Sequence, residues 1–177
     1  KLIKPRKKFS HKGTFGHALL VAGSPNKVGA SILSAKAAMR TGCGLLTVLL
    51  PESASLAMNC SLPEAMVLKP QLAKNIIFEK YNAIAIGPGL GVQIEAVKLV
   101  KEVIENYTQP LIIDADAINI LALNPELMEH LNENCLLTPH PNEFDRLTKQ
   151  HSSTYERFLS QMALAKKYNI NIVLKGH

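Results

Sequence analysis

The sequence predicts an α/β protein built on one mainly parallel sheet with helices on both faces. Short apolar runs rich in valine, isoleucine and leucine alternate with longer segments of helical periodicity. Most of these runs are apolar at nearly every position, as in strands that are covered on both faces. Glycine or acidic residues follow several runs directly, and in an open parallel sheet such positions lie at the edge where ligands bind.

The alternation assigns six strands and four helices in chain order. The strands are residues 17–21, 45–50, 83–86, 110–113, 135–137 and 171–174. The helices are residues 30–40, 94–106, 117–131 and 155–168, and Pro125 is expected to break the third of them. A strand, helix, strand order repeated this often indicates right-handed crossovers. Residues 51–80 carry prolines that interrupt any period, and they receive no assignment.

Length and composition indicate one globular domain. The 177 residues are 47% hydrophobic, which is enough for a packed core. The chain has no uncharged apolar run of membrane-spanning length and does not begin with a signal peptide, so a cytoplasmic location is expected. Cys43, Cys60 and Cys135 are isolated from one another and odd in number, which favours reduced thiols in or near the core over disulfides or a metal site.

The net charge of +6 is concentrated at the start of the chain. Six of the 20 lysines and arginines lie within the first twelve residues, which contain no acid, and the remaining 14 balance the 14 acids. We therefore expect a basic arm or linker at residues 1–11 and a domain at residues 12–177. With no aromatic residue in the arm beyond Phe9, neither nucleic acid nor a membrane is an expected partner.

A rigid polar corner follows the fifth predicted strand. Pro139 and Pro141 fix the backbone on either side of His140, and Glu143 follows within the first turn of the next helix. The arrangement suits a preorganised binding site. A plain helix start, with Glu143 favouring the helix dipole and His140 in a surface turn, explains the corner equally well on its own.

Three further loops strengthen the case for a binding site. A polar loop at residues 22–29 opens the first helix at Ala30, and the segment Gly87–Gly91 precedes the second helix. Glycines there free backbone N–H groups to bind an anion. Asp114 and Asp116 follow the fourth strand, where they would meet a metal, a ribose hydroxyl or a phosphate-bound cation, although Asp116 also suits a helix N-cap.

Neither common nucleotide motif is present. The Gly87–Gly91 segment is spaced GxGxG and follows two earlier strands, whereas the dinucleotide fingerprint is GxGxxG after the first strand. The GxxxxGK[ST] phosphate loop is missing. Any nucleotide phosphate must therefore be held by other loops.

Seven motifs occur in an order that resembles a known family. They are KGTFGH from Lys12, the GSxxxxGA loop from Gly23, GCGLLTV from Gly42, GPGLG from Gly87, DADA from Asp114, TPHPNEF from Thr138 and VLKG from Val173. Together they resemble the ADP/ATP-dependent NAD(P)H-hydrate dehydratases of the ribokinase-like superfamily, and the likeness spans residues 12–177. The basic arm resembles the linker to an epimerase domain in bifunctional members.

The resemblance implies a reaction and assigns roles to the loops. The enzymes phosphorylate the C6 hydroxyl of the S form of hydrated NAD(P)H, using ADP or ATP with Mg²⁺, and phosphate then leaves. By resemblance four residues contact the hydrate, two residues begin the nucleotide-binding segment, and Glu143 organises Mg²⁺. Asp114 and Asp116 join it as metal candidates because they follow the fourth strand. The residues are Ala30, Gly89, Gly91 and His140 for the hydrate, Lys175 and Gly176 for the nucleotide, and Glu143, Asp114 and Asp116 for Mg²⁺. Tetramers are what the resemblance suggests.

One expected part of the resemblance is missing. The family's GTGD segment, which carries the base, lies beyond Lys175–Gly176, so no catalytic residue is assigned in this chain and this chain alone is expected to be inactive. Two alternatives stay open. One is a ribokinase-like kinase of a hydroxymethyl group on a vitamin precursor, although such kinases carry asparagine where His140 stands. The other is a non-catalytic dinucleotide-binding module.

Overall fold

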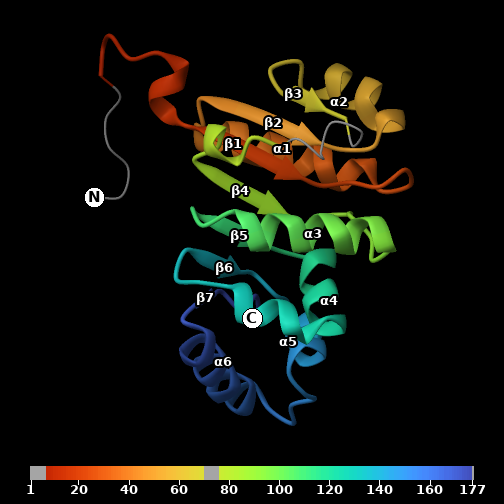
Figure 1. The fold of residues 1–177 in the computed structure, drawn as a ribbon, viewed down its shortest axis with the longest axis vertical. Helices are drawn as coiled ribbons and strands as arrows, with labels where there is room; N and C mark the ends of the chain where they lie inside the picture. Colours follow the sequence, from red (N-terminus) through yellow and green to blue (C-terminus); the bar gives the residue numbers. More distant parts are fainter. Residues whose placement is uncertain (1–6, 70–75, 177) are drawn as a thin grey trace.

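A parallel sheet of seven strands organises residues 7–69 and 76–176, which are the parts of the chain that the computed structural model describes (Figure 1). The strand order is β3-β2-β1-β4-β5-β6-β7. The strands are β1 (His17–Val21), β2 (Leu45–Leu49), β3 (Met66–Leu68), β4 (Ala83–Ile86), β5 (Leu111–Ile113), β6 (Cys135–Leu137) and β7 (Asn171–Ile172). The expected parallel α/β architecture is confirmed, and all six predicted strands are present.

The described residues also form six α-helices and four short 3₁₀-helices. The α-helices are α1 (Val28–Thr41), α2 (Ser55–Ser61), α3 (Ile94–Asn106), α4 (Asp116–Leu123), α5 (Pro141–Leu147) and α6 (Thr154–Tyr168). The 3₁₀-helices are η1 (Lys12–Phe15), η2 (Glu52–Ala54), η4 (Phe78–Lys80) and η5 (Pro125–His130). The predicted break at Pro125 is confirmed, because α4 ends before it and η5 begins at it.

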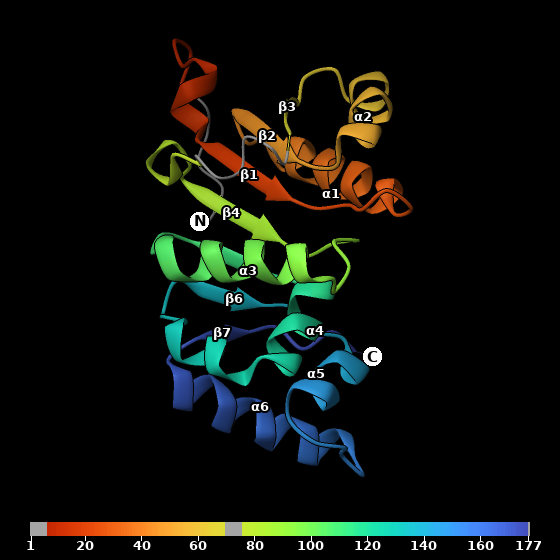
Figure 2. The same cartoon turned by 45° about the vertical axis from the view of Figure 1, so that its right-hand side comes forward.

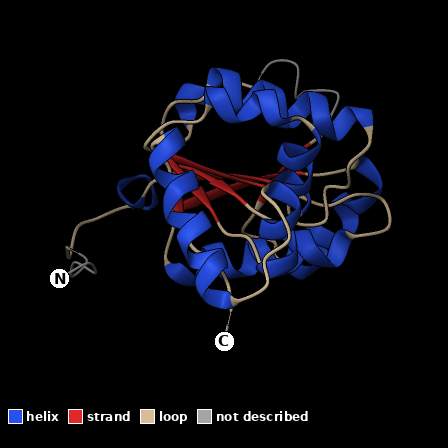
Figure 3. Ribbon diagram, turned by 90° about the horizontal axis from the view of Figure 1, so that it is seen from below, coloured by secondary structure: helices blue, strands red, loops and turns tan. Residues whose placement is uncertain are grey.

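The helices form two layers (Figures 2 and 3). Helices α1 and α2 cover one face of β1 and β2, where Ala35 and Met58 are fully buried with Val48. Helices α3 and α4 cover the other face, which presents a row of residues in register that includes Val21, Ile86, Ile113 and Leu137. This second cluster is the larger core, and α6 packs at its margin through Leu164 and Tyr168.

The strand prediction was wrong about burial in β5 and in the last predicted strand. The strand predicted at residues 171–174 ends at Ile172, its Asn171 is exposed, and Val173 has 54% of its surface exposed. Ile112, at the middle of β5, has 38% of its surface exposed, whereas its neighbours Leu111 and Ile113 have 1% and 0%. Side chains alternate along a strand, so Ile112 points to the face opposite the larger core. Within the described residues, helices α1 and α2 lie over the β1 to β3 side of that face, and the β5 part of it stays open.

This asymmetry predicts unequal costs for two neighbouring substitutions. Ile113→Ala is expected to lower the free energy of unfolding by about 3 kcal/mol, since it leaves a cavity in the core. Ile112→Ala is expected to cost about 1 kcal/mol or less, because this side chain is already in contact with water. Urea unfolding of both variants measures the difference, and equal losses would mean that the open face is covered.

Two other expectations need correction. The segment 51–80, left unassigned, contains β3, α2, η2 and η4, which are too short for a periodic pattern to show between the prolines. Cys60 is exposed on α2, so the prediction of a core or near-core thiol is wrong for it, although Cys135 is buried as expected. Residues 1–6 of the predicted arm and Pro70 lie outside the described residues.

The strand order defines where a ligand is expected. The chain moves from β1 to β2 and β3 on one side, and then returns to the other side of β1 with β4. Such a reversal leaves a crevice at the carboxyl ends of the two central strands, and ligands of open α/β folds bind there. The loops after β1 and β4, at Gly23 and Gly87, border this crevice.

None of the described helices is long and apolar enough to cross a membrane.

Candidate functional site

The predicted site residues all lie beyond the carboxyl ends of parallel strands. Gly89 and Gly91 follow β4, Asp114 follows β5, and His140 follows β6. Lys175 follows β7, and Ala30 lies in the first turn of α1, which β1 feeds through the loop at residues 22–27. Because neighbouring strands are parallel, these loops share one edge of the sheet (Figure 2).

The glycine loop after β4 packs directly against the start of α1. The N–H of Gly23 donates to the carbonyl of Pro88 at 2.8 Å, which joins the loops after β1 and β4. Gly89 has φ +66°, and a Cβ placed on it would lie 2.8 Å from the Cβ of Ala30. Only glycine therefore allows this approach without a shift, so Ala30 and Gly89 are brought together as the hydrate-binding prediction requires.

The two acids after β5 form separate polar contacts. Asp114 Oδ1 accepts from Lys175 Nζ at 2.8 Å. Asp116 Oδ2 accepts from Gly91 N–H at 2.8 Å and from Lys27 Nζ at 3.1 Å. Between them, Ala115 has φ 49° and ψ −121°, a conformation that a residue with a Cβ rarely adopts. Ala115, and not Asp116, occupies the N-cap of α4.

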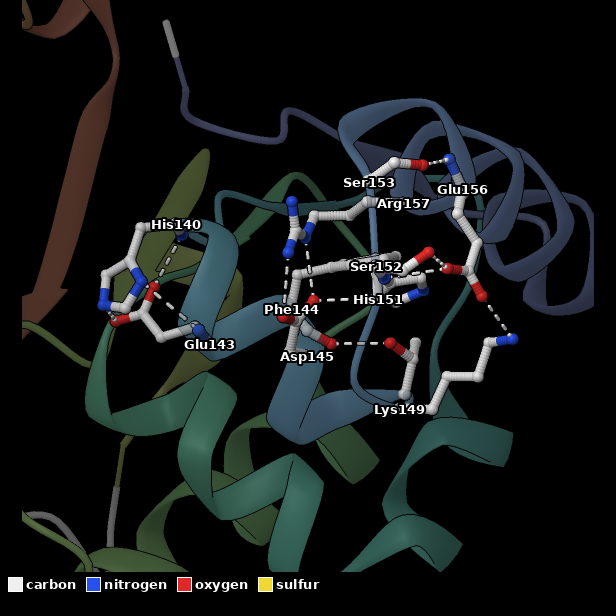
Figure 4. Close-up of polar contacts among 11 residues, drawn as sticks. His140, Glu143, Phe144, Asp145, Lys149, His151, Ser152, Ser153, Glu156 and Arg157 are labelled. Atoms are coloured by element: carbon white, nitrogen blue, oxygen red, sulfur yellow. Dashed lines mark hydrogen bonds and ion pairs between the residues drawn. The ribbon is translucent and has the colours of Figure 1, made fainter.

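His140 and Glu143 form a reciprocal cap at the start of α5 (Figure 4). The backbone N–H of His140 donates to Glu143 Oε2 at 2.8 Å, and the N–H of Glu143 donates to His140 Nδ1 at 3.2 Å. With Nδ1 accepting, the ring proton is assigned to Nε2, which lies 3.2 Å from Glu143 Oε1. The cap orients the imidazole ring of His140. The His140 side chain is 45% exposed, so a ligand can reach it.

Lys175, which follows β7, contacts the loops after β5 and β6 at the carboxyl edge of the sheet. Its backbone N–H donates to the carbonyl of Pro139 at 2.8 Å, next to His140. Its side chain reaches Asp114 across the loops. A Cβ placed on Gly176 would meet nothing within 4 Å, so the backbone there is open. The segment predicted to begin the nucleotide site thus lies between the corner after β6 and the acid after β5.

The predicted metal residues do not form a ready-made metal cage. In the described residues there is no group of three or more His, Cys, Asp or Glu side chains arranged to hold a metal ion. Both oxygens of Glu143 contact His140, and its side chain is only 7% exposed. Asp114 is more accessible, at 30%. Mg²⁺ is commonly held by one or two carboxylates together with substrate phosphates and water, and Asp114 is the most exposed of the three predicted acids.

A cleft of about 810 Å³ opens beside these loops. Its walls come from the loop after β1, the end of β2, Leu90 of the glycine loop and residues 95–102 of α3. Its lining residues are Gly23, Ser24, Pro25, Asn26, Leu49, Leu50, Pro51, Leu90, Gln93, Glu95, Ala96, Lys98, Leu99 and Glu102. It borders the switch point of the sheet, but none of the predicted site residues lines it.

A buried polar cluster lies two residues beyond Glu143 on α5 (Figure 4). Asp145, which is 7% exposed, accepts from Arg157 Nε at 2.8 Å and from Arg157 Nη2 at 2.9 Å. His151 Nδ1 lies 2.7 Å from Asp145 Oδ1, and its ring stacks on Phe144. The Arg157 guanidinium, with His151, lowers the pKa of the Asp145 carboxyl to about 2. The cluster fixes α5, and with it the His140 corner, to the start of α6.

The lowered pKa predicts a loss of stability in acid. Asp145 titrates at 3.8 when unperturbed and at about 2 in the folded protein, so its contribution is complete above the unfolded value. It is lost as the pH falls from about 4 to 2. We expect the difference in unfolding free energy between the wild type and Asp145→Asn to be constant above that range and to shrink within it. Urea titrations at several pH values measure this, and a difference independent of pH would contradict it.

Sequence analysis did not identify several residues of the site. No sequence pattern marks Arg157 or His151 as part of the site. Their partner Asp145 lies on α5, whereas Arg157 is on α6 and His151 is in the loop before it, and charged residues are usually solvated. Lys27 belongs to a loop that was identified, but its partner Asp116 is 89 residues away. The cap between His140 and Glu143 had a readable signal, since a polar residue three positions before a glutamate is typical of a helix start.

Comparison with curated proteins identifies relatives of one kind. A family model described as NAD(P)H-hydrate dehydratase matches residues 18–177. A bifunctional NAD(P)H-hydrate repair enzyme of Escherichia coli is 35% identical over 98% of this chain and 33% of its own length. An ADP-dependent (S)-NAD(P)H-hydrate dehydratase of Staphylococcus aureus is 36% identical over 99% of this chain and 64% of its own length. The chain thus spans less than two thirds of either relative.

Solved structures agree with this likeness. A ribokinase-like superfamily protein of Enterococcus faecalis superimposes with a TM-score of 0.85 at 30% identity, over 99% of this chain and 62% of that one. An ADP/ATP-dependent NAD(P)H-hydrate dehydratase of Bacillus subtilis, co-crystallized with ATP and Mg²⁺, gives 0.80 at 33% identity over 98% and 62%. The expected ribokinase-like fold is confirmed, and the chain belongs to the NAD(P)H-hydrate dehydratase family.

Proposed function

We propose that this chain carries the hydrate-binding edge of a nucleotide-dependent dehydratase that returns the S form of NAD(P)H hydrate to NAD(P)H. The observation that carries the proposal is the contact of Gly89 with Ala30 at the switch point, in the same edge as the exposed, oriented ring of His140. A partly saturated ring that bears a hydroxyl on C6 can be held by a close backbone approach on one side and a polar group on the other. The relatives named for this reaction support the substrate.

In this proposal the C6 hydroxyl gives up its proton and receives a phosphoryl group from ADP or ATP, which leaves AMP or ADP. Phosphate then leaves C6 as the ring nitrogen donates electrons, and loss of a proton from C5 forms the C5–C6 double bond of NAD(P)H. Phosphoryl transfer depends mainly on positioning and on neutralising charge. Lys175 and the open backbone at Gly176 would bind the nucleotide phosphates. Asp114, beside Lys175, would hold Mg²⁺, which supplies positive charge to those phosphates when bound. His140 would orient the hydrated ring through its exposed edge.

The same family suggests wider partners for this chain. One relative is a bifunctional repair enzyme, and the basic arm at residues 1–11 would be the link to a preceding epimerase domain. A homo-oligomer, a tetramer by resemblance, is also proposed.

A chimera tests the function directly. Residues 12–177 replace the matched part of the Bacillus subtilis enzyme, and the hydrate is supplied with ADP or ATP and Mg²⁺. We expect the absorbance of dihydronicotinamide to return at a rate that depends on the nucleotide, and His140→Ala in the chimera to slow it. A chimera that phosphorylates a hydroxymethyl substrate but leaves the hydrate unchanged would favour the kinase alternative and contradict the proposal.

A further inference from the structure

We propose that Asp116 is a positioning residue that holds the glycine loop after β4 in its ligand-binding shape. This role differs from the metal contact that the sequence suggested. The inference rests on the proposed function for its ligand, but its structural part, the fixing of Gly91 by Asp116, stands on the contacts alone.

Asp116 joins three loops of the site through a single oxygen atom. Its Oδ2 accepts from the N–H of Gly91 at 2.8 Å and from Lys27 Nζ at 3.1 Å. Gly91 closes the loop after β4, Lys27 closes the loop after β1, and Asp116 itself follows β5. The carboxylate is only 18% exposed, so these charge-assisted hydrogen bonds are partly shielded from water.

Both contacts act on the place where Gly89 meets Ala30. The backbone carbonyl of Lys27 would lie 2.9 Å from a Cβ on Gly89, so Lys27 packs against the loop while its side chain is held by Asp116. Gly91 has φ +82°, a conformation that is open to glycine and needs an external contact to be the only one populated. Asp116 therefore fixes both Gly91, at the end of the glycine loop, and Lys27, which packs against that loop.

The backbone of Ala115 gives independent support. A residue with a Cβ at φ 49° and ψ −121° is strained, and such strain persists only where the surroundings compensate for it. Here the strained residue separates two acids with different partners: Asp114 contacts Lys175, whereas Asp116 contacts Gly91 and Lys27. Backbone strain at Ala115, between Asp114 and Asp116, is consistent with a loop whose geometry matters for ligand binding.

The experiment compares two substitutions of Asp116. Asp116→Ala removes the acceptor for Gly91 N–H, whereas Asp116→Asn retains an oxygen that can accept it. Glu105→Gln is the matched control, because Glu105 also pairs with a lysine, Lys101, at 3.7 Å within one helix on the surface of α3. For each protein, NMR measures amide hydrogen exchange at Gly91 and in β4 and β5. Calorimetry measures the affinities for NADPH hydrate and for ADP with Mg²⁺.

We expect Asp116→Ala to speed exchange at Gly91 and to weaken hydrate binding by at least about tenfold each, as for loss of a hydrogen bond to a charged group. Exchange in β4 and β5 and the affinity for ADP with Mg²⁺ should change by less than about twofold, since no core contact is lost. Asp116→Asn should stay within about threefold of the wild type in both Gly91 exchange and hydrate affinity. Glu105→Gln should change none of these quantities.

Two results would overturn the proposal. One is unchanged exchange at Gly91 in Asp116→Ala. The other is equal loss of hydrate affinity in the alanine and asparagine variants together with loss of the Mg²⁺ dependence of nucleotide binding, which would make Asp116 a metal ligand. Failure of the wild type to bind the hydrate would contradict the proposed function instead, and Gly91 exchange would still decide whether Asp116 fixes the loop.

Discussion

Replacing Arg157 by methionine is expected to lower the free energy of unfolding by about 3 kcal/mol. Arg157 donates two hydrogen bonds to Asp145, whose carboxylate is 7% exposed, and methionine fills a similar volume without a donor. The variant therefore leaves a buried charge whose remaining side-chain partner among the described residues is His151. Arg157→Lys keeps the charge but not the paired geometry, so it should cost less.

Lys149→Met is the matched control for this cluster. Lys149 pairs with Glu156 at 2.9 Å, but both side chains are largely in water, and such surface pairs contribute about 1 kcal/mol or less. Asp145→Asn combined with Arg157→Met should recover part of the stability lost in the single variant, because the unpaired charge is gone. Chemical denaturation measures all four variants. If Arg157→Met cost no more than Lys149→Met, the cluster would not anchor α5.

Gly87→Ala is expected to be the most damaging glycine substitution at the binding edge. Gly87 has φ +127°, and a Cβ on it would overlap the carbonyl oxygen of Asp114 and lie 2.8 Å from the Cβ of buried Ala117. The loops after β4 and β5 would have to separate. We expect a loss of at least about 2 kcal/mol, from backbone strain and overpacking together, and weaker hydrate binding.

Gly29→Ala provides the contrast within the same site. Gly29 lies in the first turn of α1, and a Cβ there would meet nothing within 4 Å. Alanine should therefore leave stability unchanged or raise it by up to about 1 kcal/mol, through its higher helix propensity. Thermal and urea unfolding compare the two variants. A Gly87→Ala protein as stable as Gly29→Ala would show that the loops after β4 and β5 are not in close contact.

The sequence predicted six of the seven described strands because short, nearly continuous apolar runs alternate with periodic helices. It gave no assignment for β3 and α2, because prolines interrupt any periodic pattern in residues 51–80. The exposure of Ile112 was also missed, because it depends on what lies over its face of the sheet. An apolar run alone cannot reveal that a single position in it faces water.

The sequence named most residues of the candidate site but did not predict the contacts between them. Strand ends placed the loops of Ala30, Gly89 and His140 at one edge, and the family resemblance added Lys175. The partners of Asp116 and Asp145 depend on long-range contacts between loops and helices, which leave no local pattern. The strain at Ala115 was equally hidden, since alanine is compatible with almost any element.

The most direct test of the account is the affinity of this protein for the S form of NADPH hydrate in wild-type and His140→Ala forms. His140 contributes an exposed ring to the edge, whereas His130, at the end of η5, is on the surface outside the candidate site, so His130→Ala is the control. Calorimetry should show binding of the hydrate in the wild type and in His130→Ala. It should show at least about tenfold weaker binding in His140→Ala, through loss of a polar contact to the ligand. Hydrate binding that is the same in all three proteins would place the ligand elsewhere and contradict the account.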